Sequence, residues 1–435
     1  MAIFVQLGAA RDGSDPYLRT AHSWGMKAVL IETPDYIRLR KALKRQEFDQ
    51  TITVEHPSDP YQVAEAITQL PETPTLLLAG FERYIYSAYA AARMLRTLPY
   101  FPEDTFIPLN KAEQRIAISH ANTSILQPKY YVLSDHDISA QKLTDFCYPL
   151  VVKPIDGGGG LGVFFVSNFE EVEEALSELQ SITNYDGGAF QGIEVEEYVS
   201  GDEYSVQGLV QDGQSTILTF CKKFVLIEPA ANAQPLHSFR EVGHIAIRGD
   251  RVGAPIKQFA QTCVDVFKYK NGPFHIDMVR SSPRYYHLEM GFRLSGFGLV
   301  RLVQRVSGYD WAEETFASHL GKPALQSAQP SESPYMGQFT AVSQTEIDNA
   351  RQLQSLGHRI EIQLFNNPEL TNTSNRLKSD LTRHAGSIGR ITALAATFEE
   401  VENLLKTCSP GRTTEKREIG SFSGDFSLFK KGLYR

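Results

Sequence analysis

The sequence of 435 residues predicts an α/β protein of several domains, on three observations. Short apolar strands alternate with helices in the first part of the chain, which is typical of a parallel sheet with helices on its faces. Strands joined by tight turns follow one another in the middle of the chain, which indicates a central antiparallel sheet. A last strand–helix segment follows a polar spacer, "ALQSAQPSESP". We therefore expect four parts with the boundaries 1–105, 106–200, 201–325 and 326–435.

The composition excludes several classes of protein. Hydrophobic residues make up 42% of the chain, which is enough to build large cores. The formal net charge of −8 argues against nucleic acid as a partner. No apolar run approaches the ~20 residues of a membrane span, and the N-terminus lacks the pattern of a signal peptide. The four cysteines are widely spaced and form no CxxC, which favours reduced thiols and a cytoplasmic protein.

The first part is expected to hold a small parallel sheet. Its strands are predicted in "IFVQLG", "KAVLIET" and "TLLLAG", and its helices in "PYLRTAHSWG", "SDPYQVAEAITQL" and "FERYIYSAYAAARMLRTL". Gly8 and Gly13 lie five residues apart and miss the dinucleotide-binding pattern. We therefore do not expect this turn to bind a nucleotide.

The second part is built around a glycine-rich turn. A helix in "NKAEQRIAISHANTS" is followed by the strand "YPLVVKP", the glycines of "IDGGGGLG" and a second strand, "GVFFVS". The helix after it, "SNFEEVEEALSELQ", is expected to open with a capping box formed by Ser167 and Glu170.

The third part is expected to form the antiparallel sheet. The segment "IEVEEYVSGDEYSVQGLVQDGQSTILTFCKKF" predicts three consecutive strands with turns at "SGD" and "QDG". The segment "LIEPAANAQPLHSFREVGH" is expected to be a loop, and "PIKQFAQTCVDVFKY" a helix. The strands "PFHIDMVR" and "YYHLEMGFR" then predict a hairpin.

The glycine-rich turn fits a phosphate-binding flap better than the alternatives. Gly157, Gly159 and Gly162 satisfy G-x-G-x-x-G, but a dinucleotide site needs a helix directly after this pattern, and a strand follows here. A P-loop is excluded because no Lys-Ser/Thr pair follows the last glycine. Protein kinases carry their lysine downstream of the loop, whereas Lys153 precedes it. The pattern therefore indicates a flap between two antiparallel strands, with a lysine directed at phosphates.

This arrangement resembles the ATP-grasp superfamily. The motifs "NKAEQR", "YPLVVKPIDGGGGLGV", "VEEYVSGDEYSV", "HIDMV" and "HLEMGFRLSG" occur in the superfamily's order and at its usual separations. The segments "FTAVSQTEIDNA" and "AGSIGRITALAATFEEVENLL" look like the C-terminal portion of its amino-acid-ligase branch. The resemblance implies an ATP-grasp fold with an N-terminal parallel α/β domain, a glycine-rich lid subdomain, a central antiparallel sheet and a C-terminal α/β unit.

The resemblance assigns the binding of ATP to one set of residues. Lysines would neutralise the phosphates, and the flap glycines offer backbone N–H groups that no Cβ obstructs. The segment 196–199 would meet the adenine edge, and Glu203 would accept the ribose hydroxyl groups. The expected nucleotide-binding residues are Lys111, Lys153, Gly157, Gly158, Gly159, Gly160, Gly162, Glu196, Glu197, Val199, Glu203 and Lys223.

Asp277 and Glu289 are the expected Mg²⁺ ligands. Each carboxylate lies among apolar residues of a strand, where an unpaired charge would be costly, and Mg²⁺ prefers oxygen ligands. The two share one face of the hairpin only if residues 281–285 form the connection or if a bulge gives the same offset. The superfamily usually has Asn where this chain has Gly291, so a second Mg²⁺ would lack one ligand.

The resemblance implies an ATP-dependent carboxylate–amine ligase, with Lys153 and Arg293 as catalytic residues. Arg293 offers a planar set of donors to an acyl phosphate, which would form from the substrate carboxylate and ATP with release of ADP. The amine of an amino acid would then react with the acyl phosphate to give an amide and phosphate. His244, His275 and His287 are further candidates for the acceptor pocket.

Two alternatives stay open: an ATP-grasp carboxylase that uses bicarbonate, and a non-catalytic ATP-binding regulatory protein, which Gly291 favours. The expected partners are a small-molecule carboxylate and an amine, with neither nucleic acid nor membrane. Similar proteins are often homodimers, so a homodimer is one assembly that the resemblance allows.

Overall fold

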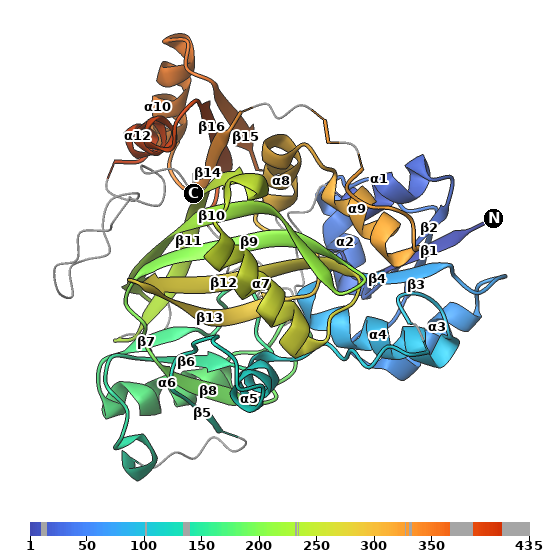
Figure 1. Cartoon of the computed structure of the whole chain (residues 1–435), viewed down its shortest axis with the longest axis horizontal. Helices are drawn as coiled ribbons and strands as arrows, with labels where there is room; N and C mark the ends of the chain where they lie inside the picture. Colours follow the sequence, from blue (N-terminus) through green and yellow to red (C-terminus); the bar gives the residue numbers. More distant parts are fainter. Residues whose placement is uncertain are drawn as a thin grey trace.

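The computed structural model describes residues 1–9, 15–100, 102–133, 140–230, 233, 235–326, 328–329, 333–365 and 386–410. They form a small parallel sheet, a large and mostly antiparallel sheet, and helices packed against both (Figure 1). Within this described part, no helix is both long and apolar enough to cross a membrane.

The N-terminal sheet is parallel, with the strand order β3-β2-β1-β4. Its strands are β1 (Ile3–Leu7), β2 (Lys27–Glu32), β3 (Gln50–Thr53) and β4 (Leu76–Ala79). Its helices are α1 (Pro16–Ser23), α2 (Pro34–Ala42), α3 (Pro60–Thr68) and α4 (Ile85–Leu95). The sequence analysis did not predict α2 or β3; three of the four residues of β3, "QTIT", are β-branched and favour a strand, but the segment is short and has only one aliphatic side chain.

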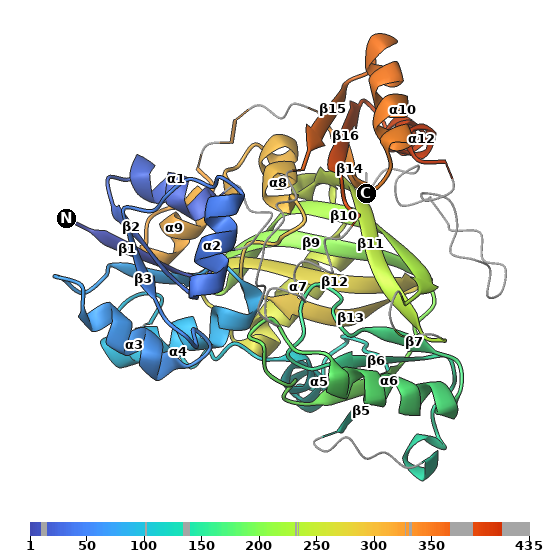
Figure 2. The same ribbon diagram turned by 180° about the vertical axis from the view of Figure 1, so that it is seen from behind.

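The second sheet contains the other described strands and continues through the rest of the chain (Figures 1 and 2). Its main path is β13-β12-β9-β10-β11-β7-β6-β8-β5, while β14 pairs with β11 and β16, and β15 pairs with β16. The strands are β5 (Tyr130–Leu133), β6 (Leu150–Pro154), β7 (Phe164–Val166), β8 (Ile193–Glu197), β9 (Asp202–Gln211), β10 (Gln214–Pro229), β11 (His237–Arg248), β12 (Gly272–Ser281), β13 (Arg284–Gly291), β14 (Tyr335–Ala341), β15 (Ile360–Leu364) and β16 (Gly389–Ala395).

Helices pack on both ends of this sheet and on its middle strands. The lid strands β5–β8 carry α6 at one end of the molecule, and α10 and α12 pack on β14–β16 at the other end (Figures 1 and 2). The helices are α5 (Lys111–His120), α6 (Phe169–Ser181), α7 (Ala254–Phe267), α8 (Leu299–Ser307), α9 (Trp311–His319), α10 (Gln344–Ser355) and α12 (Phe398–Cys408). The predicted combination of a parallel N-terminal α/β domain and a central antiparallel sheet is confirmed.

Two local predictions were wrong. Most of the segment "LIEPAANAQPLHSFREVGH", which was expected to be a loop, forms two paired strands, because β10 extends to Pro229 and β11 begins at His237. Ala230, Ala233 and Pro235 lie in the short connection between these strands. Helix α6 is capped by Asn168 instead of Ser167. The Asn168 side chain accepts a hydrogen bond from the Glu171 N–H, and the Glu171 carboxylate accepts one from the Ser167 N–H.

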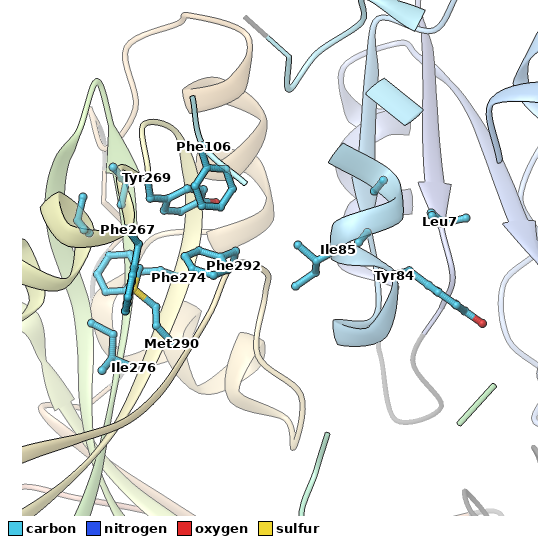
Figure 3. Close-up of a cluster of buried hydrophobic side chains, with 14 of the residues drawn as sticks. Leu7, Tyr84, Ile85, Phe106, Phe267, Tyr269, Phe274, Ile276, Met290 and Phe292 are labelled. Carbon is cyan, nitrogen blue, oxygen red and sulfur yellow. The ribbon is translucent and has the colours of Figure 1, made fainter. Parts of the chain in front are cut away.

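One apolar cluster joins the N-terminal domain to the central sheet. The Phe106 ring centroid lies 4.7 Å from that of Tyr269 and 5.0 Å from that of Phe292 (Figure 3). Burying a side chain of this size contributes roughly 1.5–3 kcal/mol. Phe292 follows β13 directly, so this packing fixes the backbone on either side of it.

Candidate active site

A cavity of about 1900 Å³ lies where the N-terminal domain, the lid strands, the central sheet and the C-terminal unit meet. It is lined by every residue that the sequence assigned to ATP, to the metal or to catalysis. Those residues are Lys111, Lys153, Gly157, Gly158, Gly159, Gly160, Gly162, Glu196, Glu197, Val199, Glu203, Lys223, Asp277, Glu289 and Arg293. One cavity is therefore lined by side chains that are far apart in the sequence.

Lys153 lies inside the lid sheet, on β6 between β7 and β8, and is 6% exposed. Its ammonium group is 2.6 Å from the Glu196 carboxylate and 3.8 Å from that of Glu194. Arg115 of α5 completes the network with a Nε–Oε1 distance of 2.9 Å to Glu194 and a Nη2–Oε2 distance of 2.8 Å to Glu196. Two cations and two anions are therefore buried together as a neutral set, which holds Lys153 in place at the cavity wall.

The pKa values of the two glutamates move in opposite directions. Burial raises the pKa of Glu194 above its ordinary value, although Lys153 and Arg115 oppose that shift. For Glu196, burial acts in the same direction, but the same two cations outweigh it and lower the pKa to about 2. Of the two carboxylates, Glu196 is therefore the one whose charge Lys153 and Arg115 stabilise more strongly.

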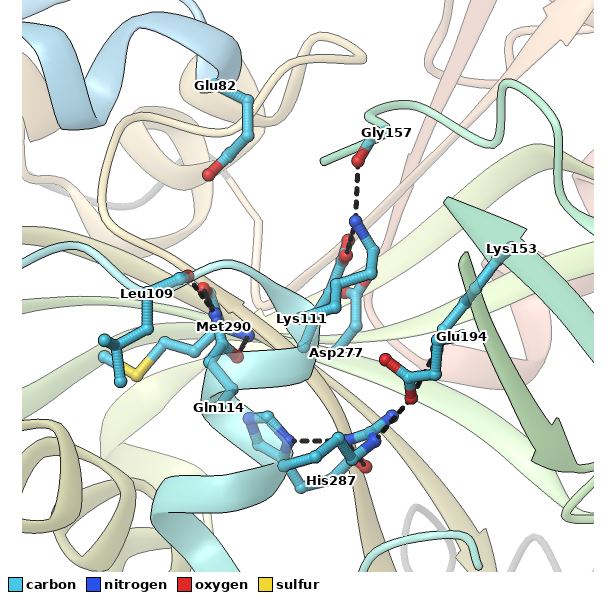
Figure 4. A network of polar contacts seen from close by, with 12 residues as sticks. Glu82, Leu109, Lys111, Gln114, Lys153, Gly157, Glu194, Asp277, His287 and Met290 are labelled. Carbon is cyan, nitrogen blue, oxygen red and sulfur yellow. Dashed lines mark hydrogen bonds and ion pairs between the residues drawn. The ribbon is translucent and has the colours of Figure 1, made fainter. Parts of the chain in front are cut away.

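Lys111 links the central sheet to the glycine flap. It is the first residue of α5, whose capping box of Asn110 and Glu113 fixes where the helix begins. Its ammonium group donates to the Gly157 carbonyl oxygen at 2.6 Å (Figure 4). The same group lies 3.0 Å from the Glu289 carboxylate. Burial lowers the pKa of Lys111, but the charge and hydrogen bond of Glu289, together with the charges of Glu82 and Glu194, outweigh burial, and the net shift is upward.

The flap itself needs glycine at particular positions. Gly159, Gly160 and Gly162 have positive φ angles of 62°, 80° and 70°, which side chains rarely adopt. At Gly162, an added Cβ would also lie 2.6 Å from Leu179 Cδ2 of α6. The loop therefore keeps its shape only with glycine, and its backbone can approach a ligand closely.

The segment expected to meet adenine is placed in the same cavity, but its glutamates have other contacts. The Glu196 carboxylate belongs to the Lys153 network, and the Glu197 carboxylate accepts a hydrogen bond from the Cys147 N–H at 2.9 Å. Val199 lies beyond the last residue of β8, and Glu203 pairs in register with Val279 of β12. Any contact of this segment with a base would therefore come from its backbone and from Val199.

Asp277 and Glu289 are opposed on the β12–β13 ladder. The connection is a two-residue turn and not the five-residue turn that one prediction required, since Ser281 pairs with Arg284. A bulge at Leu288 supplies the offset instead, because Met278 pairs with His287 while Asp277 pairs with Glu289. The bulge thus puts both carboxylates on one face of the sheet, as the alternative prediction proposed.

Lys223 of β10 holds one of these carboxylates. Its ammonium group is 2.8 Å from Asp277 and 2.9 Å from Glu241 of β11. Burial lowers the pKa of Lys223, but the two carboxylates outweigh it and raise the pKa well above the ordinary value. Lys223 therefore carries its charge beside the expected metal ligand.

The donor set fits one Mg²⁺ and lacks a ligand for a second. Asp277 and Glu289 are hard oxygen donors on one face, and no cluster of three or more His, Cys, Asp or Glu side chains suited to a metal occurs among the described residues. Phosphate oxygens and water would complete the coordination, as is usual for Mg²⁺. Gly291 pairs with His275 across the ladder, and an added Cβ would lie 2.1 Å from His275 Cε1. The imidazole therefore occupies the space that a side chain at position 291 would need.

Arg293 lies in the chain segment that follows β13. Its guanidinium is 2.7 Å from the Glu82 carboxylate of the N-terminal domain, at the turn that precedes α4, and it donates to the Leu294 carbonyl oxygen at 2.6 Å. This ion pair connects the N-terminal domain to the metal strands across the cavity.

Sequence reasoning missed several residues of the site. Arg115 is four residues from Lys111, which puts the two on one helix face, and Glu194 shares a strand face with Glu196; these spacings could have indicated both. Glu82 carried no such signal, because its partner Arg293 lies far away in the sequence, and the contact of Glu241 with Lys223 depends on the pairing of β10 with β11.

A protein-family model described as an ATP-grasp domain matches residues 146–300, which include the glycine flap and both metal carboxylates. The chain therefore contains an ATP-grasp domain, as its motifs and its cavity indicate.

The curated relatives of this chain are ligases and synthases of several kinds. A D-alanine–D-alanine ligase of Maridesulfovibrio salexigens is 31% identical over 133 residues, which cover 31% of this chain and 38% of that ligase. The curated relatives are matched over 20% to 38% of their own length.

Two solved structures share the fold over nearly the whole chain. An L-amino acid ligase from Bacillus licheniformis aligns with a TM-score of 0.66 and 16% identity, over 94% of this chain and 97% of that one. An ADP complex of N5-carboxyaminoimidazole ribonucleotide synthetase aligns with a TM-score of 0.63 and 15% identity, over 94% and 96% of the two chains.

Proposed function

We propose that this protein is an ATP-dependent carboxylate–amine ligase. ATP phosphorylates a substrate carboxylate, and the resulting acyl phosphate reacts with the amine of an amino acid to give an amide, ADP and phosphate. The observation that carries the proposal is the meeting, in one cavity, of Lys111 and Lys153, the opposed carboxylates Asp277 and Glu289, and the guanidinium of Arg293.

Each group has a physical task in this reaction. The lysines neutralise phosphate charge, and the glycine flap offers N–H groups and keeps water from the acyl phosphate. When bound by Asp277 and Glu289, Mg²⁺ supplies the charge that offsets the negative charge on the transferring phosphoryl group. Arg293 stabilises the oxyanion that forms when the amine attacks.

A carboxylase that phosphorylates bicarbonate is a second candidate. Its support is the fold shared with N5-carboxyaminoimidazole ribonucleotide synthetase, with a TM-score close to that of the L-amino acid ligase. The four cysteines are free thiols, which supports a cytoplasmic location for either enzyme.

The test measures nucleotide products in the presence of ATP, Mg²⁺ and the twenty common amino acids, with mass spectrometry of the new amides. Release of ADP that needs both a carboxylate and an amine supports the ligase, whereas dependence on bicarbonate supports the carboxylase. Release of AMP would contradict the acyl-phosphate route. Lys153→Ala should abolish ADP release, while Lys257→Ala, on the exposed face of α7, should not change it.

A further inference from the structure

His244 is a buried polar side chain that the roles described above do not use. It lies on β11, is 1% exposed and lines the cavity. Within the described part of the chain, its Nδ1 atom has no hydrogen-bond partner, and its Nε2 atom contacts only the Glu241 carboxylate, without hydrogen-bond geometry. Leaving a buried polar group unsatisfied costs about 1–3 kcal/mol, so the residue calls for an explanation.

The surroundings connect His244 to the expected reaction centre. Its Nε2 atom lies 3.3 Å from the Glu241 carboxylate, and Glu241 is 2.9 Å from Lys223, which in turn binds Asp277 at 2.8 Å. Only two side chains therefore separate His244 from a metal carboxylate.

A constrained loop holds the other side of the imidazole. The Phe297 ring packs edge-on against His244, with ring centroids 5.2 Å apart. Phe297 has a φ angle of 58°, which is rare for an aromatic residue, and its ring also faces the Arg390 guanidinium at 5.8 Å. Since this loop follows Arg293, the imidazole and the guanidinium are positioned by one segment.

We propose that His244 is the general base that accepts a proton from the ammonium group of the amine substrate; this rests on the proposed ligase function. After that transfer, the free electron pair of the nitrogen attacks the carbonyl carbon of the acyl phosphate, and a C–N bond forms. The bond from this carbon to the phosphate oxygen then breaks, and phosphate leaves with the electron pair and the second proton of the nitrogen. His244 returns its own proton to water.

The charges facing His244 keep it in the neutral form that a base needs. Burial lowers its pKa, and the cations of Lys223 and Arg390 act in the same direction, against the carboxylates of Glu241 and Asp277. The net shift is downward, so the neutral imidazole persists below the ordinary titration range of histidine.

The test compares His244→Asn with His319→Asn. His319 of α9 is a matched control, because it is 1% exposed, has no hydrogen-bond partner on either ring nitrogen among the described residues, and has a pKa lowered to about 3 by burial, yet it does not line the cavity. Each protein receives ATP, Mg²⁺ and the pooled amino acids, with and without hydroxylamine. Hydroxylamine is largely unprotonated near neutral pH and traps acyl phosphates without a base.

We expect His244→Asn to lower amide formation by roughly 10²–10⁴-fold, the usual contribution of a general base, while hydroxamate formation stays within a few-fold of the wild-type rate. The rate of amide formation by the variant should rise about tenfold per pH unit as the pH approaches the pKa of the amine. Over the same pH range, the rate of the wild-type protein should stay constant. Equal losses of amide and hydroxamate, or an unchanged amide rate, would overturn the assignment. A wild-type protein that forms neither product contradicts the ligase itself, and the role of His244 with it.

Discussion

The ammonium group of Lys111 lies 3.0 Å from the carboxylate of Glu289. Burial would discharge both groups, yet the charge and hydrogen bond of Lys111, together with other nearby positive groups, outweigh burial and hold the pKa of Glu289 well below its usual range. A residue expected to bind phosphate and a residue expected to bind metal are therefore kept charged by each other. In the complex with ATP, the phosphates would contact Lys111 and the cation would contact Glu289, so each of the two residues would keep a partner of opposite charge.

Lys111→Ala should weaken ATP binding. The variant loses one charge-assisted contact to phosphate, worth about 1.5–3 kcal/mol, which corresponds to roughly 10–150-fold in the dissociation constant. Calorimetric titration with a non-hydrolysable ATP analogue measures it, with the surface variant Lys257→Ala as control. An unchanged affinity would remove Lys111 from the nucleotide site.

Asp277→Asn and Glu289→Gln should each weaken divalent-cation binding by roughly tenfold or more, because each removes an anionic oxygen ligand. Electron paramagnetic resonance of Mn²⁺ in the presence of the same ATP analogue measures the bound metal directly. Asp250→Asn, at an exposed position, is the control. Full Mn²⁺ binding by both variants would rule out a shared metal site on β12 and β13.

Gly291→Ala should destabilise the fold, because the new Cβ would lie 2.1 Å from His275 Cε1 and His275 is only 6% exposed. Overpacking of this kind costs about 1–3 kcal/mol. His275→Ala in the same chain should relieve most of the loss. Thermal unfolding of the two single variants and the double variant measures the coupling, and additive effects would show that the imidazole moves aside.

Glu196→Gln should lower stability at neutral pH and much less in acid. The pKa of Glu196 falls from 4.5 to about 2 on folding, so its contribution is present above about pH 4.5 and is lost as the pH falls towards 2. Removing one member of a buried ion network costs up to about 3–5 kcal/mol. The difference in melting temperature between variant and wild type should therefore shrink from pH 6 to pH 2.

The exposed variant Glu170→Gln provides the baseline for that series. Glu194, whose raised pKa gives the opposite pH dependence, is present in both the variant and the wild type. A melting-temperature difference that is constant over this range would contradict the assignment of the ionised carboxylate.

Local patterns predicted the parts of the site that a short segment determines. The strand before the glycines singled out Lys153, and the apolar neighbours of Asp277 and Glu289 within their strands, together with the ATP-grasp motifs, singled out these two carboxylates. The features that place these residues relative to one another could not be predicted from local sequence. The Leu288 bulge and the contact of His275 with Gly291 depend on the packing of two strands. The role of Arg115 likewise depends on its contacts with β8, about eighty residues away in the chain.

The sheet that carries the flap is joined to the central sheet by a very short seam. Strand β7 pairs with β11 through only His237–Phe165 and Ser238–Phe164, whereas β10 and β11 pair along most of their length. The consequence is mechanical. Few backbone hydrogen bonds at this junction resist a rotation of the lid strands, so the restraint falls on side-chain contacts that cross it, such as Arg115 with the His287 carbonyl oxygen and Lys111 with Glu289. The position of the flap should therefore respond to a ligand that replaces those contacts.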